Sequence, residues 1–160
     1  MAAKVGDRVP DVQVMTMGPN GPQPVQTGDV LGRGRVVLFA VPGAFTPTCS
    51  DEHLPGFVVS ADKLKAKGAS LIACIAVNDV FVMDAWGKAR GVGDNIVMLA
   101  DGNGDFAKQM GLELDGRSFG MGTRSQRYAA IIEDGVIKLL NVEPGSGVTV
   151  SSADTILNAL

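Results

Sequence analysis

The sequence has 160 residues, of which 46% are hydrophobic and 19% are charged, a composition typical of a chain that folds around a buried core. With 14 Lys and Arg residues against 17 Asp and Glu residues, the formal net charge is -3, which argues against nucleic acid as a partner. Two Cys and one His are too few for a disulfide scaffold or a Cys/His zinc site, so we expect no metal and assign any thiol chemistry to one or both cysteines.

Five short apolar runs predict strands, at residues 36–41, 71–77, 96–100, 128–132 and 136–142. Apolar residues at helical spacing between the first three runs predict two crossover helices, and therefore parallel strands. The short Gly-containing turn between the last two runs predicts an antiparallel hairpin. We therefore expect a single α/β domain over residues 1–160, with a mixed central sheet of five to seven strands and helices on both faces.

Two segments complete the expected fold. Residues 17–35 are rich in Gly and Pro and are interpreted as an extended hairpin or a surface loop. Residues 151–154 resemble a capping box, which predicts a final amphipathic helix that covers one face of the sheet.

The segment with the clearest chemical signal runs from the end of the first strand into a helix and contains Cys49. Open α/β sheets place their sites at this position. Thr48 and Asp51 predict a helix N-cap, which would put Cys49 at the first helical position, where backbone N–H groups and the helix dipole favour a thiolate. Cys49 is therefore predicted to be a nucleophile, the alternative being a small buried residue in a turn. Because Thr46 stands where a Cys-x-x-Cys motif has its first Cys, no disulfide can form within this segment.

The run Pro42-Gly43-Ala44-Phe45-Thr46-Pro47-Thr48-Cys49, followed by residues 53–57, resembles the type II (atypical) peroxiredoxins, most closely their plant-like members. Segments at 77–79, 81–82, 85–87, 99–101, 124–128 and 141–144 resemble the same family in the same order. The resemblance implies a thioredoxin-like fold and the reduction of hydrogen peroxide and alkyl hydroperoxides. It also implies a homodimer without a bound cofactor, and an external thiol reductant, either glutaredoxin with glutathione or thioredoxin.

Carried over by position, the resemblance implies that Cys49 is the peroxidatic cysteine, that Pro42 and Thr46 belong to its motif, and that Arg127 is the active-site arginine. Thr46 and Arg127 are then expected to donate hydrogen bonds to the peroxide oxygens. Cys74 is the candidate resolving cysteine, because plant-like members have one at the matching position. Its place inside an apolar run is equally typical of a core residue, so both interpretations stay open.

His53 lies four residues after Cys49 and is interpreted as a partly exposed residue at the rim of the site, with a Cys–His pair as the alternative. Two other functions stay open: a cysteine hydrolase that uses Cys49 and His53, and a redox sensor or interaction protein that uses Cys49 without efficient turnover. No apolar run approaches the ~18 residues that a membrane span needs. We therefore expect a cytoplasmic protein, or an organellar one whose transit peptide has been removed.

Overall fold

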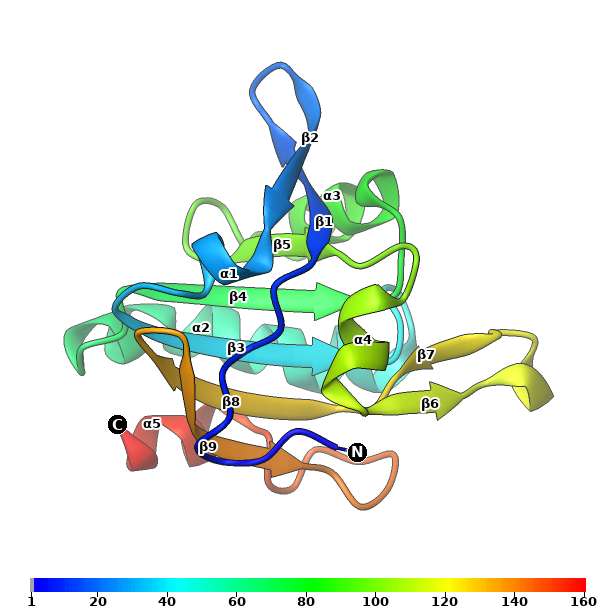
Figure 1. Ribbon diagram of the computed structural model, residues 1–160. Coiled ribbons are helices and arrows are strands. Elements are labelled where there is room, and N and C mark those ends of the chain that lie inside the picture. Colours follow the sequence, from blue (N-terminus) through cyan, green and yellow to red (C-terminus); the bar gives the residue numbers. More distant parts are fainter. Residues whose placement is uncertain (1) are drawn as a thin grey trace.

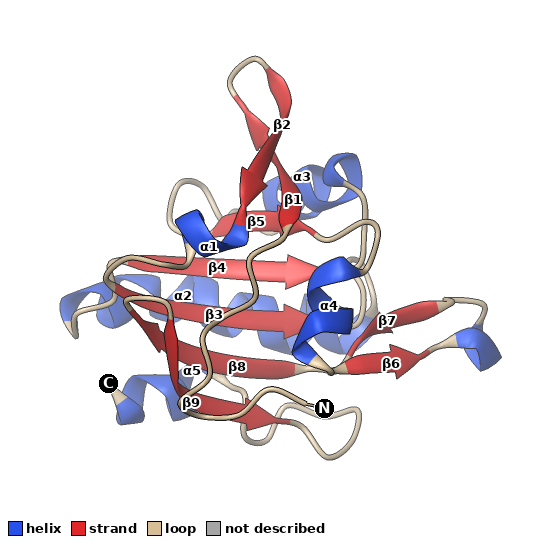
Figure 2. Cartoon of the chain, in the orientation of Figure 1, coloured by secondary structure: helices blue, strands red, loops and turns tan. Residues whose placement is uncertain are grey.

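The computed structural model describes residues 2–160, and its main feature is a mixed sheet of seven strands in the order β2-β1-β5-β4-β3-β8-β9 (Figure 1). The strands are β1 (Gln13–Gly18), β2 (Gly21–Gln26), β3 (Arg35–Val41), β4 (Leu71–Ala76), β5 (Val97–Ala100), β8 (Tyr128–Glu133) and β9 (Val136–Val142). The helices are α1 (Thr27–Val30), α2 (Leu54–Ala66), α3 (Val80–Ala89), α4 (Asp105–Met110) and α5 (Ala153–Ala159), coloured blue in Figure 2. The expected mixed sheet with helices on both faces is confirmed.

The centre of the sheet is parallel, as the crossover pattern predicts. Strand β3 pairs with β4, and β4 pairs with β5, both in parallel register. Every residue of β3 and β4 except the first is buried, because helices or loops cover both faces of these strands. Successive crossovers that step in one direction along a sheet place their helices on the same face, and α2 and α3 accordingly lie together behind the sheet in Figure 1.

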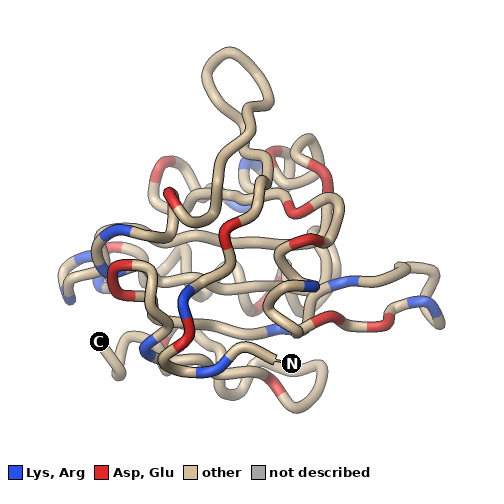
Figure 3. The backbone as a smooth tube through the Cα atoms, in the orientation of Figure 1, with Lys and Arg blue, Asp and Glu red and all other residues tan. Residues whose placement is uncertain are grey.

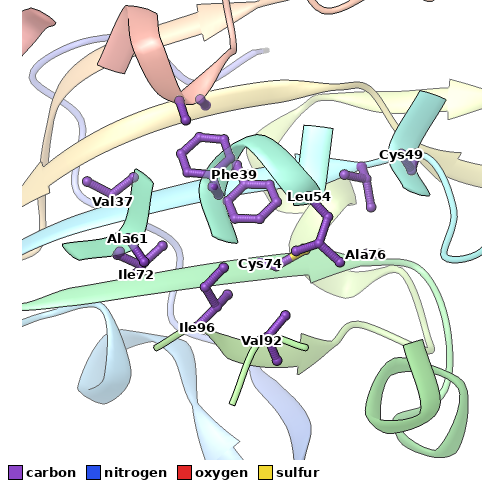
Figure 4. Packing of buried hydrophobic residues seen from close by; sticks show 14 of the residues in the cluster. Val37, Phe39, Cys49, Leu54, Ala61, Ile72, Cys74, Ala76, Val92 and Ile96 are labelled. Carbon is purple, nitrogen blue, oxygen red and sulfur yellow. The ribbon is translucent and has the colours of Figure 1, made fainter. Parts of the chain in front are cut away.

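Two apolar cores form, one on each face of the sheet. One contains inward-facing residues of β3 and β4 packed against α2, α3 and α5 (Figure 4). In this core Phe39 and Phe57 stack at a ring-centroid distance of 4.0 Å. The other contains the alternate residues of the same strands, packed against α4. Alternation along β3 therefore sends Phe39 to one core and Leu38 to the other.

The pairing of β8 with its neighbours brings three chain segments together at the carboxyl end of β3. Strand β8 is antiparallel to β3, with Tyr128 opposite Ala40, so the residue before β8 lies beside the end of β3. Strand β9 returns antiparallel to β8, with Tyr128 opposite Val142. Arg127 and Glu143, which flank these strands, are therefore neighbours, and the backbone N–H of Glu143 donates to the carbonyl of Arg127 at 2.9 Å.

The predicted β8–β9 hairpin is confirmed. Its turn has φ values of +49° at Asp134 and +85° at Gly135, and two successive positive φ angles match the twist of the flanking strands. The extended hairpin expected near residues 17–35 is present as β1 and β2, although it begins earlier, at Gln13.

Other elements have no counterpart among the predicted ones. These are α1, α4, the short helix η2 (Arg117–Phe119), and a separate hairpin of β6 (Glu113–Asp115) and β7 (Thr123–Ser125). The hairpin projects beside the carboxyl end of β3 in Figure 1. No helix in the described part of the chain is long and apolar enough to cross a membrane. Acidic and basic residues are interspersed along the chain rather than gathered by sign (Figure 3).

Candidate active site

Cys49 lies in the first turn of the helix that follows β3, but not at the position that the sequence predicts. The helix begins at Pro47, and Thr48 already has helical angles (φ −65°, ψ −39°) and makes no side-chain capping bond. The predicted N-cap at Thr48 is therefore wrong. Proline fits the start of a helix because its φ is fixed and its missing N–H needs no partner there. Cys49 is consequently the third residue of the helix, still within the turn where backbone N–H groups lack intrahelical partners.

The helix is wound more widely at this point. Residues Cys49–His53 form a π-helix (η1), and the N–H of Leu54 donates to the carbonyl of Cys49, five residues earlier. Pro55 follows immediately and has no N–H to continue an α-helical ladder, so the wider turn accommodates it. Such π segments are frequent at functional sites.

Arg127 makes the central contact of the site. Its Nη2 donates to the Sγ of Cys49 at 3.1 Å, and the two side chains are 5% and 0% exposed. The guanidinium stays protonated in proteins, so this contact places a permanent positive charge against the sulfur. Electrostatic interactions are stronger in a buried setting than in water, so this contact is the main electrostatic feature of the site.

His53 is buried and holds the other arm of the same guanidinium, so the prediction of a partly exposed rim residue is wrong. The side chain is 1% exposed and lies against the rings of Phe39 and Phe57. Its Nδ1 is 2.9 Å from Nη1 of Arg127, and its Nε2 is 2.9 Å from the carbonyl oxygen of Ser151. Within the described residues His53 makes no hydrogen bond to Cys49, which removes the geometric basis of a Cys–His pair.

The two partners of His53 fix its protonation. Arg127 can only donate and a carbonyl can only accept, so Nδ1 must be unprotonated and Nε2 must carry the hydrogen. Burial, with a further contribution from the charge of Arg127, lowers the pKa of His53 from 6.5 to about 4. His53 is therefore neutral near pH 7, and it orients Arg127 without adding a second positive charge.

We expect this lowered pKa to make folding stability depend on acidity. Between pH 6.5 and about 4 the unfolded chain binds a proton at His53 and the folded chain does not, so stability falls as pH is lowered through this window. The loss attributable to His53 is up to about 3 kcal/mol. Urea unfolding at both ends of the window measures it. In His53→Gln, whose amide also donates and accepts but does not titrate, the pH dependence should be shallower; an equally steep loss would contradict this assignment.

A cavity of about 450 Å³ is lined by Arg127, which contacts Cys49, and by Thr48, the residue before Cys49. Its lining also includes Pro42 and Thr46 of the loop after β3, and the apolar side chains of Leu114 and Phe119 from the β6–β7 region. Phe119 is 83% exposed, so this part of the lining lies at the protein surface. The cavity has the chemistry expected for a small polar group carried on an apolar chain. A second cavity of about 440 Å³ lies against α3 and β5, and its lining includes neither Thr46 nor Arg127.

Thr46 has a different hydrogen-bonding role from the expected one. Its hydroxyl donates to the carbonyl of Gly43 at 2.7 Å, which closes the loop between β3 and the helix. The hydrogen is thus engaged, while lone pairs of the oxygen remain able to accept a bond from a hydroperoxide. Within this loop Phe45 has φ +63°, an uncommon angle for a bulky residue, so the loop is held in one strained shape.

Cys74 lies in the core on β4, beside Phe39 on one neighbouring strand and Met98 on the other. It is fully buried, and Figure 4 shows it on a different element from Cys49. Burial, and secondarily repulsion from Cys49, raises the pKa of the Cys74 thiol well above its usual value. Both cysteines are free thiols in this structure.

The sequence analysis assigns no role in the site to three residues that the structure places there. Ser50 accepts a hydrogen bond from Nε1 of Trp86 at 2.9 Å, which ties the π-helix to α3. Ser151 supplies the carbonyl for His53, and Glu143 lines the cavity. Ser50 belongs to no motif, the predicted capping box at residues 151–154 does not indicate that Ser151 contacts His53, and only the pairing of β8 with β9 places Glu143 beside Arg127. Over residues 2–160, no group of three or more His, Cys, Asp and Glu side chains is arranged to hold a metal ion.

Comparison with known proteins gives consistent matches over the whole chain. A model of the Redoxin family matches residues 4–157. The chain is 50% identical over 166 residues to Peroxiredoxin-2E, chloroplastic, of Arabidopsis thaliana, a match that covers 98% of this chain and 68% of that protein. It is 48% identical over 159 residues to Peroxiredoxin-2B of Arabidopsis thaliana, covering 98% and 97%. The crystal structure of reduced Prx3 from Vibrio vulnificus in complex with hydrogen peroxide superposes with a TM-score of 0.94 at 50% identity, covering 98% of each chain.

Proposed function

Because this chain belongs to the Redoxin family and is a peroxiredoxin, a thiol-dependent peroxidase with a thioredoxin-like fold, we propose that Cys49 is its peroxidatic cysteine. The substrates are hydrogen peroxide and alkyl hydroperoxides. The observation that carries the proposal is the contact of 3.1 Å between Nη2 of Arg127 and Sγ of Cys49, next to the cavity.

The chemical step is a displacement on oxygen. The thiolate of Cys49 attacks the terminal oxygen of the hydroperoxide, an S–O bond forms, and the O–O bond breaks. The leaving alkoxide or hydroxide takes up a proton and departs as an alcohol or water. Cys49 is oxidised by two electrons to the sulfenic acid, and the peroxide is reduced by the same two electrons.

The surrounding residues stabilise charge as it moves from sulfur to oxygen. Arg127 contacts the sulfur and also lines the cavity, so its guanidinium can stabilise negative charge first on the sulfur and then on the leaving oxygen. Thr46 can accept the O–H of the attacked oxygen, because its own hydrogen is engaged with Gly43. His53 keeps Arg127 in place, and Pro42 lines the cavity and contributes no N–H group.

The sulfenic acid can be located directly. After one equivalent of peroxide, a reagent specific for sulfenic acids should label residue 49, and peptide mapping should find residue 74 unlabelled. Label at residue 74 alone would contradict the assignment. Sustained peroxide consumption with a reductant separates the peroxidase from a redox sensor, which would stop after a single oxidation.

We propose further that an external thiol reduces the sulfenic acid directly, releasing water and leaving a mixed disulfide that a second thiol resolves. Glutathione with glutaredoxin, or thioredoxin, supplies thiols of this kind. The proposal rests on Cys74, whose burial at the centre of the sheet and raised pKa make it a poor attacking thiolate.

Replacement of Cys74 by alanine is accordingly expected to leave turnover with the glutaredoxin system at the level of the parent. Alanine is preferred to serine because it buries no unpaired hydroxyl. The measurement is the loss of peroxide coupled to glutathione oxidation, with the thermal midpoint recorded as a control for core packing. Loss of turnover in a stably folded Cys74→Ala protein would assign Cys74 the resolving role instead.

A homodimer is also part of the proposal. Phe45, Phe81 and Phe119, all at the carboxyl end of the central strands, are 54%, 65% and 83% exposed, and exposed aromatic residues are typical of interfaces. Sedimentation equilibrium should give twice the chain mass, whereas a monomer at all concentrations would contradict it. The relatives include a protein named as chloroplastic, and the cytoplasmic location stays a prediction.

A further inference from the structure

We propose that Glu143 is a positioning residue for peroxide reduction. Its carboxylate holds the turn at residues 149–151, whose Ser151 carbonyl fixes the tautomer of His53 and thereby the orientation of Arg127. The inference rests on the proposed roles of Cys49 and Arg127, and it adds a residue that does not touch the sulfur.

The carboxylate of Glu143 is the most heavily hydrogen-bonded side chain near the site. It is largely buried, and it accepts from the backbone N–H groups of Thr149, Val150 and Ser151, each at 2.8 Å. The hydroxyls of Thr149 and Ser151 donate to it as well, at 2.6 and 2.7 Å. Five donors from three consecutive residues therefore converge on one carboxylate, which fixes the path of that turn.

These bonds keep Glu143 ionised. Burial alone would raise its pKa, but the hydrogen bonds from Thr149 and Ser151 outweigh this effect and lower the pKa to about 2. The group therefore acts as an acceptor at every pH at which the enzyme would operate.

The same bonds direct the negative charge away from Arg127. The backbones of the two residues are hydrogen-bonded neighbours, yet none of the ion pairs found between residues 2 and 160 includes Glu143 or Arg127. A direct pair would draw the guanidinium away from Cys49. Engagement of the carboxylate by residues 149–151 leaves the guanidinium to face the sulfur and His53.

A continuous series of hydrogen bonds leads from this turn to the sulfur. The carbonyl of Ser151, whose own N–H is held by Glu143, accepts from Nε2 of His53 at 2.9 Å. Nδ1 of His53 then accepts from Nη1 of Arg127 at 2.9 Å, and Nη2 of Arg127 reaches Sγ of Cys49 at 3.1 Å. If the Ser151 carbonyl moves, His53 loses the acceptor that keeps its hydrogen on Nε2. A hydrogen on Nδ1 would oppose a donor nitrogen of Arg127 and displace the guanidinium.

Glu143→Met tests this directly, because methionine has similar length but no oxygen acceptor. We expect the rate constant for hydrogen peroxide to fall about 10- to 100-fold through misplacement of Arg127. His53 is the only histidine of the sequence, so the nitrogen resonances of isotope-labelled histidine report its tautomer without overlap. The reduced parent should show hydrogen on Nε2 alone, and reduced Glu143→Met should show both tautomers.

Two further variants make the result specific. Glu143→Gln keeps one oxygen acceptor and can donate to the Thr149 hydroxyl instead, so it should recover most of the rate and the parent tautomer. Glu133→Met removes a more exposed carboxylate at the other end of β8 and should match the parent in both measurements. If Glu143→Met does not fold, the double variant Thr149→Val with Ser151→Ala, which removes both hydroxyl donors, takes its place and should show the same changes to a smaller degree.

The proposal is overturned if the folded variant keeps the parent tautomer, whether or not its rate falls, because the route through His53 would then be absent. It is equally overturned by a parent-like rate with an altered tautomer. Failure of the proposed function would give a different result, because Cys49→Ser would then still consume peroxide. The effect of Glu143→Met on the tautomer of His53 is measured without peroxide and does not depend on that outcome.

Discussion

Cys49→Ser is expected to lose peroxide turnover with any thiol reductant, falling by at least ~1000-fold to the background of the reductant alone. Serine keeps the size of the side chain but its hydroxyl is not ionised near neutral pH, so Arg127 would face an uncharged oxygen that cannot displace an alkoxide. The measurement is the initial rate of peroxide loss, with circular dichroism to show that the fold is kept.

The control for this variant is Cys74→Ala, which alters the other cysteine and leaves the Arg127 contact in place. Residual turnover in Cys49→Ser, at a level that the reductant alone does not explain, would assign the chemistry to another group. A parallel loss in both cysteine variants would show instead that the two thiols act as a pair.

Arg127→Lys should lower kcat/KM for hydrogen peroxide by about 100-fold although the charge is retained. The guanidinium reaches Cys49 and His53 with two nitrogens at once, whereas a lysine ammonium is a single point that cannot reproduce this fork. Burying the more strongly hydrated ammonium of lysine would also carry a larger desolvation penalty. Stopped-flow fluorescence of Trp86, which is hydrogen-bonded to the residue after Cys49, follows the reaction.

The matched control is Arg35→Lys, the same change at the opposite end of β3, where Arg35 pairs with Glu133 at 3.0 Å. It should react at the parent rate. If Arg127→Lys also keeps that rate, the positive charge alone is sufficient, and the paired contacts of Arg127 with Cys49 and His53 do not contribute to catalysis.

The strands and the crossover helices were predictable because buried strands and helices have recognisable patterns of apolar residues. Strands buried on both faces, such as β3 and β4, are continuous apolar runs, and the helices between them repeat at helical spacing. The helix α4 is only six residues long and the β6–β7 hairpin is mostly exposed, so neither has a periodic signal of useful length.

The site was predictable only in part, for a similar reason. Cys49 and Thr46 belong to one local motif, and the family resemblance supplies Arg127. The burial of His53 depends on Phe57, one turn further along the same helix, and on Phe39 and Ser151, which come from two distant parts of the chain. The N-cap at Thr48 was misplaced because Pro47 can begin a helix as readily as a capping residue can precede one. Long-range contacts of this kind leave no local pattern.

The π-helix at Cys49–His53 bears on how readily the oxidised cysteine is oxidised further. If Cys49 is the peroxidatic cysteine, as proposed, a protein reductant is too large to reach its fully buried sulfur, and we expect these turns to open before the sulfenic acid is reduced. Until they open, a second peroxide competes for the same sulfur and converts it to the sulfinic acid, which is not reduced by ordinary thiols. The missing N–H of Pro55 lowers the cost of opening, and the bond between Ser50 and Trp86 raises it. We therefore expect the balance of these two local features to influence how much peroxide the enzyme tolerates before Cys49 is over-oxidised.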